Sequence, residues 1–234
     1  WGKFHLQNVL GQYIGDDCTM TSEAIYHNHP ELEKYKDSTI LIVGAGPSTV
    51  DVDWEDEERD FTWSCTKFYL NDKLQDCGVD FASVGGNVDL ADPQFQSFIT
   101  RHKTLCAFEG GVSPFKTGEQ INSFKDAFPD QATYFHTRYF SKLGSVARLV
   151  VFASLLGAKE IKFVGFDGNP TKQKHAFEGE QKSHDEVWRN SSSLNMYRRQ
   201  FAIFWDYLLK MDNGILYTNL GKGHPNNLTT DILE

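Results

Sequence analysis

At 234 residues, the chain is long enough to bury a sizeable core within one large domain. Its hydrophobic content of 40% and charged content of 24% are typical of a globular protein. The net charge of −9 argues against nucleic-acid binding, which needs a basic surface, but it is compatible with a small anionic ligand held by local groups. No apolar run reaches the length of about 18 residues that a membrane-spanning helix needs.

The four cysteines are widely spaced and include no C-x-x-C pair: Cys18, Cys65, Cys77 and Cys106. A chain of this size does not need disulfides to stabilise its core. Reduced thiols and a cytoplasmic location are therefore favoured over a disulfide framework. The oligomeric state is left open, a homo-oligomer included.

Three parts are predicted along the chain. Residues 1–37 form an N-terminal extension packed on the domain, residues 38–220 a Rossmann-like nucleotide-binding domain, and residues 221–234 a C-terminal tail. Within the domain, the polar stretch at residues 169–195 shows little regular patterning. It is expected to form a lid-like segment that follows the Gly-Phe-Asp motif at residues 165–167.

Short apolar runs followed by turn residues predict the strands of this domain. In chain order they are Thr39–Val43, Phe61–Leu70, Val79–Val84, Lys103–Phe108, Ala132–Thr137, Ile161–Val164 and Ile215–Thr218. Apolar residues at helical spacing predict two helices, Lys142–Leu156 and Met196–Met211. Strands that alternate with helices, several of them ending in glycine, are typical of a doubly wound, mostly parallel α/β sheet, which is the fold class we expect.

In such a sheet, ligands bind outside the carboxyl ends of the strands. Five segments are therefore expected to meet at one edge of the sheet: Gly44–Ser48, Cys65–Lys67, Gly85–Asn87, Glu109–Gly111 and Gly165–Gly168. Their convergence indicates a ligand site more strongly than any single motif does.

The turn after the first strand of the domain reads Gly44-Ala45-Gly46-Pro47-Ser48. Its glycines permit close backbone approach and leave N–H groups that suit phosphate, Pro47 can occupy the first turn of a helix, and Ser48 can add a hydroxyl. NAD is disfavoured because Thr49 replaces the third fingerprint glycine and the second strand ends in Cys65-Thr66-Lys67 instead of an acid. A purely structural strand-to-helix turn is the alternative.

Three segments occur in the same order and spacing as in a known group of proteins: Ile40–Ser48, Trp63–Leu70 and Gly144–Asp167. They read ILIVGAGPS, WSCTKFYL and GSVARLVVFASLLGAKEIKFVGFD. In these segments the chain resembles the bacterial family-42 sialyltransferases and the related MptE-like proteins, which include archaeal 6-hydroxymethylpterin pyrophosphokinases and flagellin-glycosylating proteins. The resemblance covers residues 38–220 and implies a nucleotide-binding domain.

The resemblance and the expected edge of the sheet together give the candidate nucleotide-binding residues: Gly44, Ala45, Gly46, Pro47, Ser48, Thr66, Lys67, Gly85, Asn87, Ser145 and Asp167. Three positions depart from the sialyltransferase pattern. Ala45 and Thr66 each stand where that family has asparagine. Val146 replaces the glycine of a T-S-G motif whose serine matches Ser145. The MptE-like branch accepts Gly-Ala-Gly-Pro-Ser in the first turn, so the donor nucleotide stays open.

The resemblance also implies roles in the chemistry. The sialyltransferases place a histidine base in the lid, so His175 or His184 is expected to deprotonate an acceptor hydroxyl, which suits a side chain that titrates near neutral pH. Arg138 and Tyr139 are expected to stabilise the leaving phosphate. Asp167 is expected to bind ribose hydroxyls or a metal held by a diphosphate, although it can also cap the following turn.

Three functions are compatible with these residues. The favoured one is a transferase, a sialyltransferase-like glycosyltransferase that takes a nucleotide-activated donor such as a CMP-sugar and a sugar or other small-molecule acceptor, with no metal required. The second is a diphosphate transferase that uses ATP and Mg²⁺, with Asp167 near the metal. The third is a non-catalytic nucleotide-binding or interaction domain.

Overall fold

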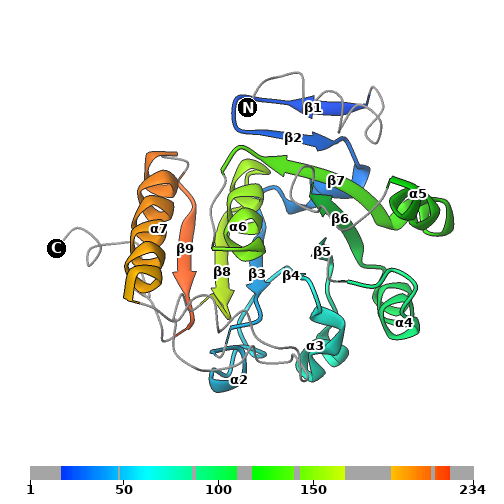
Figure 1. Ribbon diagram of the computed structural model, residues 1–234, viewed down its shortest axis with the longest axis horizontal. Helices are drawn as coiled ribbons and strands as arrows, with labels where there is room; N and C mark the ends of the chain where they lie inside the picture. The colour runs from blue at the N-terminus through cyan, green and yellow to red at the C-terminus, as the bar shows by residue number, and fades with distance from the viewer. Residues whose placement is uncertain are drawn as a thin grey trace.

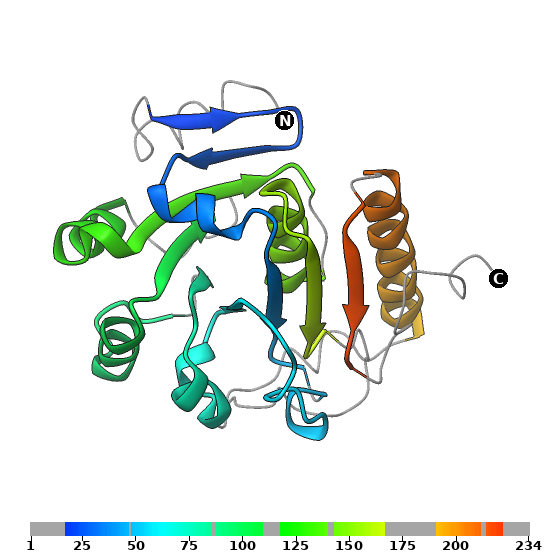
Figure 2. The same ribbon diagram turned by 180° about the vertical axis from the view of Figure 1, so that it is seen from behind.

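The computed structural model describes residues 17–46, 48–85, 88–109, 118–139, 143–166, 191–211 and 214–221. These residues form a nine-stranded sheet in the order β1-β2-β7-β6-β5-β4-β3-β8-β9 (Figure 1; Figure 2 from behind). The strands are β1 (Cys18–Met20), β2 (Ala24–His27), β3 (Thr39–Val43), β4 (Phe61–Cys65), β5 (Phe81–Val84), β6 (Leu105–Glu109), β7 (Ala132–Thr137), β8 (Glu160–Val164) and β9 (Leu216–Asn219).

Helical segments connect the strands. The α-helices are α2 (Ser48–Asp51), α3 (Asp72–Cys77), α4 (Pro93–His102), α5 (Gly118–Ala127), α6 (Ser145–Leu155) and α7 (Ser191–Lys210), and the 3-10 helices are η1 (Pro30–Tyr35), η2 (Phe68–Leu70) and η3 (Pro129–Gln131). From β7 to β9 in the sheet order, every neighbouring pair is parallel. This confirms the expected fold class, a single α/β domain with a mostly parallel sheet.

Two hydrophobic cores cover the two faces of the sheet. Along β3, Ile40 and Ile42 belong to one core and Leu41 and Val43 to the other, which is the alternation expected of successive side chains on a strand. The first core includes residues of α6 and α7, and the second includes residues of α3, α4 and α5. Because both faces are covered, β3 reads as a continuous apolar run from Ile40 to Val43.

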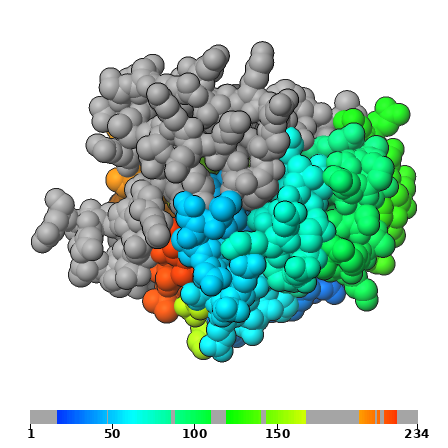
Figure 3. Space-filling view, turned by 90° about the horizontal axis from the view of Figure 1, so that it is seen from below, coloured from blue at the N-terminus to red at the C-terminus, as the bar shows by residue number. Residues whose placement is uncertain are grey.

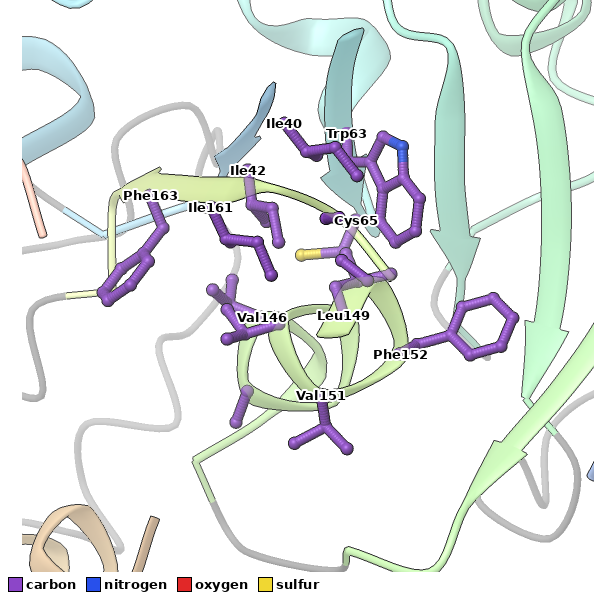
Figure 4. Packing of buried hydrophobic residues seen from close by; sticks show 14 of the residues in the cluster. Ile40, Ile42, Trp63, Cys65, Val146, Leu149, Val151, Phe152, Ile161 and Phe163 are labelled. Atoms are coloured by element: carbon purple, nitrogen blue, oxygen red, sulfur yellow. The ribbon is translucent and has the colours of Figure 1, made fainter. Parts of the chain in front are cut away.

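Aromatic side chains pack α6 against the face of the sheet that the first core covers. Phe152 of α6 stacks on Phe135 with ring centroids 4.8 Å apart, and Trp63 stacks on Phe81 at 4.4 Å. Figure 4 shows Phe152 and Trp63 on the same side of the sheet, with Val146 and Leu149 of α6 directed toward the β-strands. This packing fixes the position of α6, and therefore of its first residue.

The described part of the N-terminal segment adds to the sheet itself. β2 pairs antiparallel with β7, where Ile25 lies opposite His136, and β1 pairs antiparallel with β2. η1 then crosses to the first face, where Tyr35 is fully buried with its ring 4.8 Å from that of Trp63.

Several predicted boundaries were wrong. The expected long strand Phe61–Leu70 ends at Cys65 and continues as η2. The strand expected from Lys103 begins only at Leu105, because Lys103 ends α4 in the left-handed region with φ +53°. The predicted helix from Lys142 is described from Ser145 onward.

Helices α3, α4 and α5 were not predicted. α4 has a clear start, since the Asp92 side chain accepts a hydrogen bond from the Gln94 N–H at 2.9 Å and Pro93 occupies the first turn. None of the described helices is both long enough and apolar enough to cross a membrane.

Candidate functional site

The order of the strands reverses at β3. The chain continues from β3 to β4, β5, β6 and β7 on one side, whereas β8 and β9 lie on the other side. In doubly wound sheets, ligands bind where the order reverses, outside the carboxyl ends of the strands. The ends of β3 and β8 lie near α2 at the lower side of Figure 1, and Figure 3 shows the molecule from that side, with the residues around α2 and α3 in blue and cyan across its middle.

Backbone hydrogen bonds join the glycine turn to the end of β8. The N–H of Gly44 donates to the Val164 carbonyl at 2.8 Å, and the N–H of Gly46 donates to the Gly165 carbonyl at 2.9 Å. The N–H of Gly165 in turn donates to Ser48 Oγ at 2.8 Å, and Ser48 is buried. The expectation that both glycine amides are free for phosphate is therefore corrected, because the turn continues the pairing of two parallel strands.

Close backbone approach explains why glycine stands at Gly44 and Gly165. A Cβ on Gly44 would lie 2.5 Å from the Gly165 carbonyl oxygen and 2.8 Å from Val146 Cγ2. Gly165 has φ +69°, and its Cβ would lie 2.1 Å from Thr49 Oγ1. Thr49, which occupies the position of the third fingerprint glycine, donates from Oγ1 to the Gly44 carbonyl at 2.8 Å. These glycines are required by the packing of the two strand ends.

The residue after β4 is locally strained. Thr66 has φ +57°, in the left-handed region that β-branched residues rarely adopt, and its N–H donates to the Ser83 carbonyl at 2.9 Å. Strain of this kind is concentrated at functional sites. Burial raises the pKa of the neighbouring Cys65 thiol to about 11, and the positive charge of Arg148 acts in the opposite direction.

Several candidates from neighbouring strands are partly exposed at this edge of the sheet. Ala45, Thr66 and Gly85 follow the adjacent strands β3, β4 and β5, and Lys67 follows Thr66. The Gly85 carbonyl accepts a hydrogen bond from the Val88 N–H at 3.2 Å. The structure therefore brings residues from three neighbouring strand ends to one edge of the sheet.

Ser145 opens α6 at the same edge, because this helix follows the carboxyl end of the parallel strand β7. Gly144 precedes it with φ +89° and, as the N-cap residue, has no side chain that could bond the N–H groups of the first turn. Ser145 is partly exposed. A hydroxyl beside the N–H groups that open a helix is a suitable donor set for an anion.

A buried ion pair lies beneath the first turn of α6. Arg148 Nε donates to Glu109 Oε2 at 2.5 Å, and Arg148 Nη2 donates to Ser145 Oγ at 3.3 Å. Burial raises the pKa of Glu109, and Arg148 opposes this shift. This pair was not predicted, although an arginine within the apolar run from Val146 to Val150 is a signal that can be recognised in the sequence.

The two residues expected to stabilise the leaving phosphate differ in their surroundings. Arg138 is exposed, and its backbone N–H donates to the Glu23 carbonyl at 2.7 Å. Tyr139 is buried, with its ring 5.5 Å from that of Phe204 and 5.0 Å from that of Tyr207. The ring of Tyr139 therefore packs against α7 and is not exposed at the carboxyl edge of the sheet.

Other predicted residues fall outside the described part of the chain: Pro47, Asn87, Asp167, His175 and His184. Their roles stay predictions. Within the described part, no three His, Cys, Asp or Glu side chains are grouped as metal ligands.

Two solved structures share this fold. The monofunctional alpha-2,3-sialyltransferase Cst-I from Campylobacter jejuni matches with a TM-score of 0.53 and 17% identity, over 80% of this chain and 76% of its own. The sialyltransferase CST-II, solved in complex with a trisaccharide acceptor and CMP, matches with a TM-score of 0.53 and 18% identity, over 78% and 80%. No family model and no curated protein matches the chain. The chain thus has a sialyltransferase-like fold, and the likeness to MptE-like proteins stays a prediction.

Proposed function

We propose that the chain is a glycosyltransferase that moves a sugar from a nucleotide-activated donor, in the first place a CMP-sugar, to a sugar acceptor. The observation that carries this proposal is the fold shared with two sialyltransferases, one of them solved with CMP and a trisaccharide. The candidate nucleotide residues Ala45, Thr66 and Ser145 lie where the strand order reverses or beside it, which supports the same function.

The side chains at this edge suit a nucleotide phosphate. Ser145 and the N-terminal amides of α6 offer hydrogen-bond donors and the positive end of a helix dipole. Thr66 and Gly85 then contact the remainder of the nucleotide from the ends of β4 and β5. In this proposal the glycine turn shapes the wall of the site and fixes its neighbours, because the Gly44 and Gly46 amides are already bonded.

His175 or His184 is the general base in this proposal. Either imidazole can take the proton of the acceptor hydroxyl while the sugar leaves the donor phosphate. Asparagine at the catalytic position should lower the rate of transfer by about a hundredfold or more, since a general base contributes that much. His102→Asn is the matched control, because His102 ends α4 at the opposite edge of the sheet.

Thermal-shift measurements test the choice of nucleotide. We expect CMP and CMP-sugars to raise the melting temperature without metal, while UDP, GDP and NAD have little effect. Ser145→Ala should reduce the shift, and Ser97→Ala, on an exposed position of α4, should leave it unchanged.

Two outcomes would overturn the proposed function. Stabilisation by ATP only in the presence of Mg²⁺ would assign the chain to the diphosphate transferases instead, with Asp167 near the metal. No response to any nucleotide would favour a non-catalytic interaction domain. If CMP does bind, an assay of transfer from a CMP-sugar, measured as release of CMP in the presence of sugar acceptors, separates binding from catalysis.

A further inference from the structure

The buried pair of Arg148 and Glu109 connects two elements that meet at the candidate site. Glu109 is the last residue of β6, and Arg148 lies in the first turn of α6. The Arg148 side chain is 8% exposed and the Glu109 side chain 6%. The guanidinium bonds the carboxylate through Nε and the Ser145 hydroxyl through Nη2. A single buried cation therefore fixes the serine that opens the helix.

Stability does not account for this pair. Two charges lose their hydration when they are buried, and apolar side chains of similar size often stabilise a fold as well or better. Glu109 Oε1 is also buried and has no hydrogen-bond partner among the described residues. Neighbouring positions of α6, Ala147 and Leu149, are filled by apolar side chains. The pair is therefore better explained by what it does to Ser145.

The contact with Arg148 determines which way the Ser145 hydroxyl can donate. A hydroxyl has one proton to donate and two lone pairs that accept. Because Arg148 Nη2–H occupies a lone pair of Oγ, the proton of Ser145 remains for another acceptor. Ser145 is partly exposed at the N-terminus of α6, where a phosphate oxygen is the acceptor best matched to the local dipole.

We propose that Arg148 is a positioning residue that directs the Ser145 hydroxyl toward the phosphate of the bound nucleotide, with Glu109 holding the guanidinium in place. This inference rests on the proposed function. It adds that Arg148 acts through Ser145 and does not itself contact the nucleotide.

A double-mutant cycle tests the inference. The Kd for CMP is measured by calorimetry for the wild type, Arg148→Gln, Ser145→Ala and the double variant. Each single change should weaken binding about tenfold, and the double variant should also be weaker by only about tenfold, because both changes remove the same hydrogen bond to phosphate. Arg199→Gln, on an exposed position of α7, removes the same charge and should change Kd by less than about twofold.

Other results would contradict the inference. If the double variant binds about a hundredfold more weakly, the two residues act independently and Arg148 is not a positioning residue for Ser145. Wild-type affinity in folded Arg148→Gln overturns it as well. Failure of the wild-type protein to bind CMP is a different result, which overturns the proposed function and this inference together.

A second cycle covers the case in which Arg148→Gln does not fold. Glu109→Asp keeps the charge but draws the carboxylate back by one methylene, which should displace the guanidinium from Ser145. We expect this change to weaken CMP binding in the wild-type background and to have no further effect in the Ser145→Ala background. An equal effect in both backgrounds would show that Glu109 acts only on the fold.

Discussion

Replacement of Thr66 by asparagine should stabilise the folded protein. Thr66 has φ +57°, in a region that costs an ordinary L-residue roughly 1–2 kcal/mol and is least suited to a β-branched side chain. Asparagine adopts this region far more readily, because its short side chain can bond the local backbone. We therefore expect a net gain of about 1 kcal/mol.

Urea denaturation measures this gain. The midpoint should rise while the slope of the transition stays the same, and the melting temperature should rise by roughly 2–4 °C for a chain of this size. Thr66→Val is the control, because valine keeps the branched Cβ and loses the hydroxyl, so it should give no gain. An asparagine variant less stable than the wild type, or a valine variant equally stabilised, would refute the argument from backbone strain.

The same variant reports on the candidate site. The sialyltransferases that the sequence resembles have asparagine at the position of Thr66, so Thr66→Asn should also bind CMP more tightly if this residue contacts the nucleotide. Affinity is measured well below the melting temperature, where both proteins are folded. A gain in stability with unchanged affinity would place Thr66 outside the nucleotide site while leaving the strain argument intact.

The interior offers three further tests. Gly165→Ala should lower the free energy of unfolding by about 3 kcal/mol or more in urea, because its Cβ would collide with Thr49 Oγ1 at a positive φ. Burial raises the pKa of Glu109, so this carboxyl holds its proton to higher pH in the folded state than in the unfolded state. Its contribution to the free energy of unfolding should therefore fall as pH rises from 4.5 toward the folded pKa. Glu109→Gln, measured by urea denaturation over the same pH range, should not show this fall. Cys65 and Cys106 are buried free thiols and should react with a thiol reagent at pH 8 only after denaturant is added.

The central strands could be predicted because strands that are buried on both faces consist largely of apolar residues. β3 is covered on both faces, so Ile40–Val43 reads as a continuous apolar run, and in β8 only the partly exposed Lys162 interrupts the apolar residues between Ile161 and Val164. The carboxyl ends of such strands share one edge by topology, which is why the segments around Thr66 and Gly85 were expected near the site. The missed α4 and α5 carry many polar side chains, so their helical pattern is weak in the sequence.

The contacts within the site could not be predicted in the same way. Glu109 and Arg148 are 39 residues apart in the chain and meet only because the fold brings the first turn of α6 close to the end of β6. The pairing of β2 with β7 also joins distant segments. Sequence spacing identifies which residues reach one edge of the sheet, but it does not determine which polar groups are already bonded to each other there.

The glycine turn illustrates the difference between a requirement of the fold and a requirement of the ligand. β3 and β8 are adjacent parallel strands, and the backbones of Gly44 and Gly165 meet where they end. A protein with this strand order needs small residues there whether or not it binds a nucleotide. Changes at these glycines should therefore lower stability first, whereas changes at Ser145, which is partly exposed, should lower affinity first. In the proposed function, specificity for the nucleotide therefore comes from side chains such as Ser145 and Thr66.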